Sequence, residues 1–230
     1  MTTSAFSKFL NQISPEPLYV LDPNIPPQAF TPLDLSVTNQ ELQKINTASS
    51  KDLEAYVFGV IQSKNAKVGY GGYNETRNLY QRSLHFNQND VTTERNIHLG
   101  MDLWIEAGTP IFATLEGKIH SFKNNANYGD YGPTIVLRHE IEGVEFYTLY
   151  GHLSLESLSA LEVGQTIQKG ECLATLGDAS VNGDYPPHLH FQIIKDMQGL
   201  HGDYPGVCAK QDVDFYLGNC PDPNLLLKIG

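Results

Sequence analysis

Two spacings of hydrophobic residues divide the chain near residue 90. Before this point apolar residues recur at helical spacing in three short stretches. They predict helices over 4–13, 38–45 and 51–63, the last with Ser50 as its N-cap. A proline-rich stretch that reads as extended loop follows the first of them, and the glycine- and tyrosine-rich residues 68–80 are expected to form a loop. The first ninety residues are therefore predicted to be a partly helical extension.

From about residue 94 the apolar residues alternate with a period of two. This pattern predicts strands over 97–105, 111–122, 134–139, 144–153 and 188–194, separated by turns rich in glycine, proline and asparagine. A short helix is also expected in the tail over 212–227. The predicted fold is mainly β, an antiparallel sheet similar to barrel-sandwich hybrids. The extension would occupy residues 1–90 and the core residues 91–230.

Composition narrows the range of partners. Hydrophobic residues make up 40% of the 230 residues, which is enough for a core, and the formal net charge is −11. Such a surface repels phosphate backbones and anionic lipids, so neither nucleic acid nor a membrane is expected as a partner. The sequence contains no run of about 18 apolar residues, so no membrane span is predicted. The N-terminal residues lack the features of a signal peptide, so a cytoplasmic location is expected.

The three cysteines do not suggest a metal or redox motif. Cys172, Cys208 and Cys220 are widely spaced and form no Cys-x-x-Cys pair. They are expected to be reduced thiols, although Cys208 and Cys220 could pair in an oxidising compartment.

Four of the eight histidines occur in patterns typical of metal sites. In His98-Leu-Gly-Met-Asp102 the imidazole and the carboxylate would share one face of a strand, with Gly100 leaving space between them. In His188-Leu-His-Phe-Gln192 two imidazoles would share the polar face of an otherwise apolar strand. Packing does not readily explain polar groups at these spacings.

A fourth histidine belongs to a separate predicted strand. His152 follows Tyr150 in Tyr-Gly-His-Leu, and the two are expected to share a face. Catalytic zinc takes three ligands from histidine and carboxylate groups, and further histidines can then move protons. The three groups together predict a zinc site. The remaining histidines lack such partners and are expected at the surface or in loops: His85, His120, His139 and His201.

These groups resemble, in order and spacing, the LytM/lysostaphin-type zinc metallopeptidases, the peptidoglycan DD-metalloendopeptidase family. The resemblance covers residues 94–200. It implies that His98, Asp102 and His190 bind Zn²⁺, that His152 and His188 are catalytic, and that the reaction is hydrolysis of a peptide bond.

A closer similarity concerns residues 124–133, 146–154 and 186–192. They resemble the LytM-like module found between a phosphotransferase and an aminotransferase in some bacterial fusion proteins. That resemblance implies a peptide or a small amide as substrate in place of cell wall. One departure from the family is Gln192, where glutamate is frequent.

Three further residues are candidates for contact with substrate. Arg77 could hold a substrate carboxylate, or form a surface salt bridge with Glu75. Tyr150 could donate to an oxyanion or pack in the core. Gln192 could orient a ligand imidazole. Two alternatives to a peptidase stay open: a zinc amidohydrolase of a non-peptide metabolite, and a binding or regulatory module without catalysis. The second is disfavoured because all five histidine and aspartate positions are intact.

Overall fold

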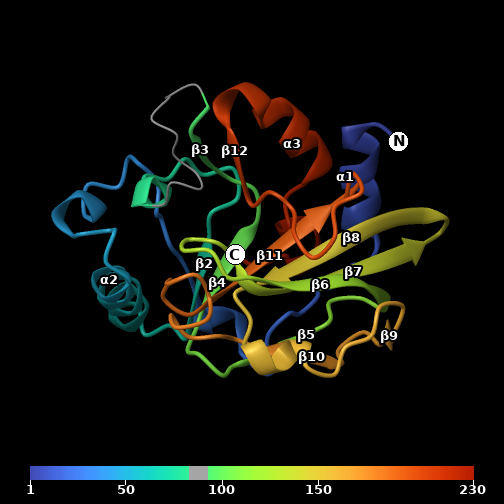
Figure 1. The fold of residues 1–230 in the computed structure, drawn as a ribbon, viewed down its shortest axis with the longest axis horizontal. Coiled ribbons are helices and arrows are strands. Elements are labelled where there is room, and N and C mark those ends of the chain that lie inside the picture. The colour runs from blue at the N-terminus through green and yellow to red at the C-terminus, as the bar shows by residue number, and fades with distance from the viewer. Residues whose placement is uncertain (83–92) are drawn as a thin grey trace.

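A mixed β-sheet forms the centre of the molecule (Figure 1). The computed structural model describes residues 1–82 and 93–230. Within these residues eight strands form one sheet in the order β1-β2-β4-β11-β8-β7-β6-β9, antiparallel throughout except for the parallel pair β1–β2. Its strands are β1 (Phe30–Pro32), β2 (Val68–Gly71), β4 (Met101–Trp104), β6 (Gly117–Asn125), β7 (Gly132–Ile141), β8 (Val144–Gly151), β9 (Thr166–Ile167) and β11 (His188–Ile194). The predicted mainly β fold is confirmed, with a mixed sheet in place of a purely antiparallel one.

Two small ribbons and several helices complete the fold. The ribbons pair β5 (Pro110–Phe112) with β10 (Cys172–Thr175), and β3 (Arg95–His98) with β12 (Val207–Ala209). The α-helices are α1 (Thr3–Gln12), α2 (Ser50–Ser63), α3 (Val213–Asn219) and α4 (Asn224–Leu227). Short 3₁₀ turns occupy Pro27–Ala29, Leu42–Lys44, Leu79–Arg82, Leu155–Leu158 and Lys210–Asp212. No helix among the described residues has the length and apolar character needed to cross a bilayer.

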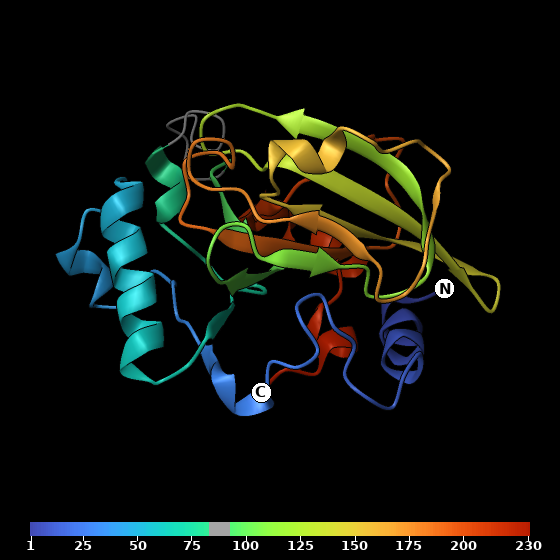
Figure 2. The same cartoon turned by 90° about the horizontal axis from the view of Figure 1, so that it is seen from below.

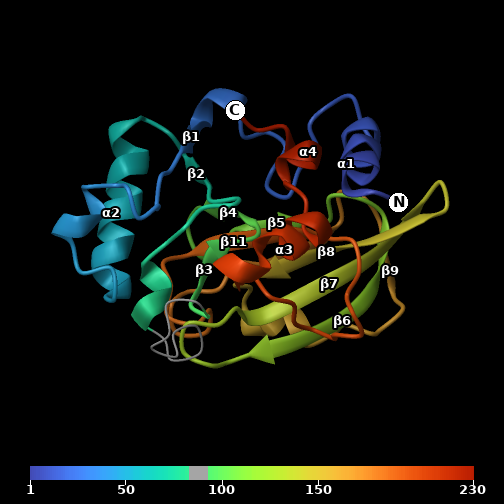
Figure 3. The same cartoon turned by 90° about the horizontal axis from the view of Figure 1, so that it is seen from above.

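The predicted helices of the extension are found in part. The Thr2 hydroxyl caps α1 by accepting from the Ala5 N–H, and Phe6 packs edge-on against Phe146 of β8. Helix α1 lies beside α4 on one side of the sheet (Figures 2 and 3). Helix α2 begins one residue earlier than predicted, with Ser49 in place of Ser50 as its N-cap. The helix expected over 38–45 is only the 3₁₀ turn Leu42–Lys44.

The extension also contributes strands to the sheet. The loop prediction for 68–80 is wrong at its start, where β2 pairs with β4 through Gly69, Tyr70 and Gly71. A Cβ at Gly69 would lie 2.3 Å from Leu33 Cδ1, so glycine lets the 31–35 segment pack against this strand. The sheet therefore continues into the extension, while the domain boundary at residue 90 stays a prediction.

The strand predicted over 97–105 is interrupted in the middle. Strand β3 ends at His98 and β4 begins at Met101, with Leu99 bonded through its N–H to the Gly206 carbonyl. At Gly100 an added Cβ would lie 2.5 Å from the His190 ring. The prediction that His98 and Asp102 share one straight strand is therefore wrong, although the break still brings both side chains to the same place.

The two faces of β11 have different surroundings. Leu189, Phe191 and Ile193 belong to the main hydrophobic core with Met101 and Leu103. The opposite face carries His188, His190 and Gln192, as the period-two pattern predicted. The three cysteines are free, with Cys172 exposed and the other two buried.

His139 corrects the prediction of a surface or loop position. It lies in β7 with 1% of its surface exposed, and its Nε2 and Nδ1 bond to Thr148 Oγ1 (2.7 Å) and to the Glu116 carbonyl (2.8 Å). His201 is exposed and His120 half-buried, their rings stacked. His85 lies outside the described residues.

We expect His139 to make folding sensitive to acid. Burial lowers the pKa of His139 to about 4, against 6.5 for an unfolded chain. Between these pH values the unfolded state binds the proton and the folded state does not, so stability falls as the pH falls. His139→Gln should reduce the slope of the free energy of unfolding against pH by up to about 1.4 kcal/mol per pH unit. Urea unfolding of both proteins at a series of pH values from 4 to 7.5 measures this slope. Equal slopes for wild type and variant would contradict the prediction.

Candidate metal centre

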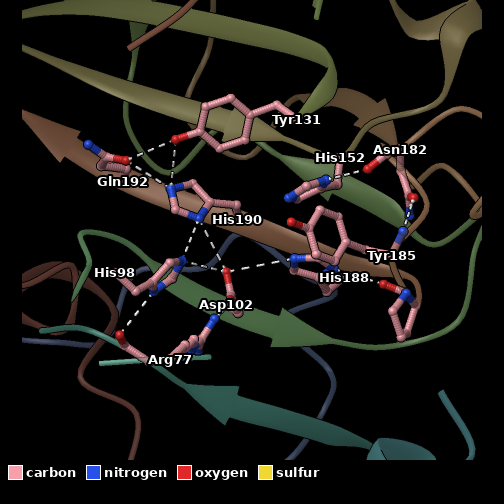
Figure 4. Close-up of polar contacts among 12 residues, drawn as sticks. Arg77, His98, Asp102, Tyr131, His152, Asn182, Tyr185, His188, His190 and Gln192 are labelled. Atoms are coloured by element: carbon pink, nitrogen blue, oxygen red, sulfur yellow. Dashed lines mark hydrogen bonds and ion pairs between the residues drawn. The ribbon is translucent and has the colours of Figure 1, made fainter. Parts of the chain in front are cut away.

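Three strands bring the predicted ligands together (Figure 4). The antiparallel register of β4 and β11 places Asp102 directly opposite His190, and His98 ends the neighbouring strand β3. The His98 Nε2 and His190 Nδ1 atoms lie 2.9 Å apart, and Asp102 Oδ1 lies 3.3 and 3.2 Å from them. Among the described residues these three side chains form the group that could hold a metal ion.

The hydrogen bonds of the two imidazoles fix which nitrogen faces the centre. His98 Nδ1 lies 2.9 Å from the Gly72 carbonyl, which can only accept, so this nitrogen carries the hydrogen. Gln192 donates its Nε2 to the Pro205 carbonyl, which turns its Oε1 toward His190 Nε2 at 2.8 Å. In neutral imidazoles the free lone pairs therefore lie on His98 Nε2 and His190 Nδ1.

The centre consequently contains acceptors without a hydrogen to share. Two nitrogen lone pairs and a carboxylate oxygen converge within 3.3 Å, an arrangement that is unfavourable unless a cation lies among them. Metal–ligand bonds of about 2.0–2.1 Å in a tetrahedral site place ligand atoms about 3.3 Å apart, close to the observed spacing. The donor set therefore fits a metal ion.

Asp102 is buried and held by an arginine from the extension. Its Oδ2 accepts from Arg77 Nη1 at 2.6 Å, and both side chains are at most 2% exposed. Burial alone would raise the pKa of Asp102, but His98 and Arg77 beside it hold the pKa well below its usual value. The carboxylate is therefore ionised, as a ligand must be.

The two predicted catalytic histidines lie on one side of this centre. His188 is two residues before His190 on β11, and its Nε2 lies 3.9 Å from Asp102 Oδ1. His152 follows directly after β8 with φ of 61°, and its ring centroid lies 4.1 Å from that of His188. All five predicted histidine and aspartate side chains thus meet in one place.

Backbone carbonyls orient both of these rings. His152 Nδ1 donates to the Asn182 carbonyl and His188 Nδ1 to the Pro186 carbonyl, each at 2.8 Å. Their Nε2 atoms are therefore the unprotonated ones. Burial lowers the pKa of His188 to about 4 and that of His152 well below its usual value, so both rings are neutral at pH 7.

The three candidates for substrate contact have different positions. Tyr150 lies on the opposite face of β8, where its hydroxyl bonds to Thr114, because the left-handed backbone at His152 breaks the expected alternation. Arg77 does form the salt bridge with Glu75, but the pair is not on the surface, because the arginine is 2% exposed and also pairs with Asp102. Gln192 accepts from His190 Nε2 and is buried beneath that ring.

Several aromatic residues at the site were not predicted. Trp104, the only tryptophan in the chain, stacks on His188 with ring centroids 4.0 Å apart. Tyr131 donates its hydroxyl to Gln192 Oε1 at 3.4 Å and lies 3.3 Å from His190 Nε2. Trp104 could have been found as the residue two after Asp102 on the same strand face; Tyr131 comes from a distant turn.

A cavity of about 230 Å³ opens over the centre. Five of its lining residues are tyrosine or tryptophan, and the lining includes the five site side chains. The other lining residues are Arg77, Leu79, Tyr80, Arg95, Trp104, Gly129, Asp130, Tyr131, Tyr185, Leu200, Asp203, Tyr204, Pro205, Gly206 and Val207.

Comparison with known proteins finds a family model that matches the part of the chain that carries the site. Residues 96–202 match the model of peptidase family M23. This M23 segment contains every one of the five site side chains. The resemblance to LytM/lysostaphin-type peptidases is therefore supported at the level of the family, and the fusion-protein context stays a prediction.

Curated relatives match the same part of the chain. An uncharacterized metalloprotease of Haemophilus influenzae is 36% identical over 102 residues, which cover 44% of this chain and 19% of the relative. Peptidoglycan DD-endopeptidase ShyC of Vibrio cholerae is 30% identical over 125 residues, or 54% of this chain and 25% of the relative. The aligned region thus spans about a quarter or less of these relatives' lengths.

A solved structure is also similar. The catalytic domain of the antimicrobial peptidase lysostaphin from Staphylococcus simulans shares 26% sequence identity with a TM-score of 0.40, covering 66% of this chain and 92% of that one.

Proposed function

We propose that the chain is a zinc-dependent metallopeptidase that hydrolyses a peptide bond. The observation that carries the proposal is the convergence of His98 Nε2, His190 Nδ1 and Asp102 Oδ1, three acceptors with no hydrogen between them. Two imidazoles and one carboxylate form a donor set suited to Zn²⁺. A zinc ion bound there supplies a Lewis acid for the scissile carbonyl and lowers the pKa of the hydrolytic water.

The chain's own residues supply the proton transfers. His152 and His188 present unprotonated Nε2 atoms, and the carbonyls of Asn182 and Pro186 hold the rings in that tautomer. Either Nε2 accepts a proton from the attacking water, and the resulting imidazolium donates to the oxyanion or to the leaving amine. Trp104 stacks on His188 and restricts the rotation of its ring.

For the substrate we propose a short peptide or a small amide, in preference to cross-linked peptidoglycan. Each of the five site side chains is at most 5% exposed, and the cavity above them is small, with five tyrosine or tryptophan residues among those that line it. Such a site suits a narrow, flexible chain better than a branched polymer. A cytoplasmic location would agree with this substrate and stays a prediction.

A side-by-side assay tests the function and its substrate. We expect purified protein to cleave soluble glycyl peptides or muropeptides faster than it releases material from purified sacculi. Chelation should abolish cleavage and added Zn²⁺ should restore it, because the bound metal is the Lewis acid that would polarise the scissile carbonyl. The readout is the appearance of new amino groups, with boiled protein as the control.

The other outcomes would each replace the proposal. Digestion of sacculi with soluble compounds untouched would identify a wall hydrolase. Hydrolysis confined to non-peptide amides would identify an amidohydrolase. A protein that carries a full complement of zinc and cleaves none of these compounds would be a binding or regulatory module.

A further inference from the structure

The 72–77 loop lies outside the M23 segment but contacts the metal centre directly. Its backbone runs along β3, where the Asn74 N–H donates to the His98 carbonyl and the His98 N–H donates to the Glu75 carbonyl, each at 2.9 Å. Arg77 continues the pairing with its N–H on the Asn96 carbonyl at 2.8 Å. The loop is thereby fixed in register with the ligand His98.

Two contacts reach the ligand side chains from this loop, one from its backbone and one from a side chain. The Gly72 carbonyl accepts from His98 Nδ1, and Arg77 Nη1 donates to Asp102 Oδ2. Glycine at position 72 makes both possible, because its φ is 98° and an added Cβ would lie 2.0 Å from Arg77 Nη2. One short loop thus holds two of the three ligands.

A second carboxylate fixes the arginine in turn. Glu75 Oε2 accepts from Arg77 Nε at 2.5 Å, while Glu75 Oε1 accepts from the Leu35 N–H at 3.2 Å. The chain of contacts therefore runs from the 33–37 segment through Glu75 and Arg77 to Asp102. The Val37 N–H on the Thr76 carbonyl, at 2.9 Å, anchors the same segment to the loop.

We infer that Arg77, with Glu75 behind it, is a positioning residue that holds Asp102 for the metal and does not bind substrate. By occupying Oδ2, Arg77 leaves Oδ1 as the oxygen that faces the two imidazoles. The planar guanidinium, held on one side by Glu75, orients the Asp102 carboxylate and also favours its ionised form. Residues 96–202 then do not contain the whole metal site, and the extension supplies the missing support. This inference rests on the proposed metal site.

Arginine variants separate this role from substrate binding. In Arg77→Met we expect zinc affinity to fall by about 10–100-fold, the usual cost of losing an outer contact to a ligand. Arg77→Lys keeps the positive charge but not the planar guanidinium, so its zinc affinity should fall less than that of Arg77→Met. At saturating zinc, kcat should fall with little change in KM. Arg138→Met is the matched control, because Arg138 of β7 pairs with Glu145 of β8 at the surface, where the two side chains are 43% and 48% exposed.

The measurements are zinc competition against a chromophoric chelator, melting of the metal-free proteins, and steady-state kinetics. Equal zinc affinity in wild type, Arg77→Met and Arg77→Lys would overturn the inference, as would a raised KM at unchanged zinc affinity. If Arg77→Met does not fold, Arg77→Lys and Glu75→Gln decide by the same readouts. A wild-type protein that binds no zinc would instead refute the proposed function itself.

Discussion

Replacing His152 by alanine is expected to lower turnover by a factor on the order of 10²–10⁴ while the bound metal is retained, the range for loss of a general acid–base group. The ligand set of His98, Asp102 and His190 is complete without His152. Its Nδ1 is already committed to the Asn182 carbonyl, so only Nε2 faces the cavity. Removing the ring takes away a proton acceptor and leaves the metal centre in place.

Paired measurements of kcat and zinc content test this separation. His120→Ala is the matched control, since His120 lies on β6 outside the cavity and stacks on His201 at the surface. It should keep both values. Loss of zinc from His152→Ala in step with activity would show that His152 is a ligand. Full activity in His152→Ala would leave His188 as the sufficient base.

The grouping of the site residues was predicted from the sequence more accurately than the strands that carry them. His188, His190 and Gln192 share a face because β11 is regular from end to end, and a period of two is enough to place them. Strand β4 also follows this period from Met101 to Trp104. Spacing within one regular strand is local information, and it was correct wherever the strand continued.

Predictions failed where the backbone departs from regular geometry. His98 and Asp102 converge across a break at Gly100, where an added Cβ would meet the ring of His190, a residue far away in the sequence. Tyr150 was placed with His152 because the left-handed conformation of His152 has no signal in the sequence around it. His139 looked isolated because Glu116 and Thr148, its partners, come from other segments.

The role of the extension was the feature that the sequence predicted least well, again because it depends on contacts between distant segments. Composition marked 68–80 as a glycine-rich loop, and a loop arginine suggested a contact with substrate. Only tertiary pairing shows that β2 continues the sheet beside Asp102 and that Arg77 lies behind the carboxylate. Contacts between distant segments decide whether a charged residue faces a ligand or solvent.

Removing any one ligand is expected to abolish high-affinity metal binding. Isolated protein should contain about one zinc ion per chain, and His98→Ala, Asp102→Ala or His190→Ala should reduce this to a small fraction, because a site with three protein ligands loses one of them. Asp102→Ala should have the most severe effect. It also leaves Arg77 as a buried cation without this carboxylate, which costs stability.

The measurement combines elemental analysis with fluorescence. Trp104, the single tryptophan, stacks on His188 beside the ligands, so its emission should change when zinc is added to metal-free wild type and should not change in the ligand variants. Asp214→Ala and His201→Ala are matched controls because both side chains are exposed. Full zinc occupancy in all three ligand variants would refute the assignment. Loss of zinc only from Asp102→Ala would indicate a site built on the carboxylate with the imidazoles as accessory groups.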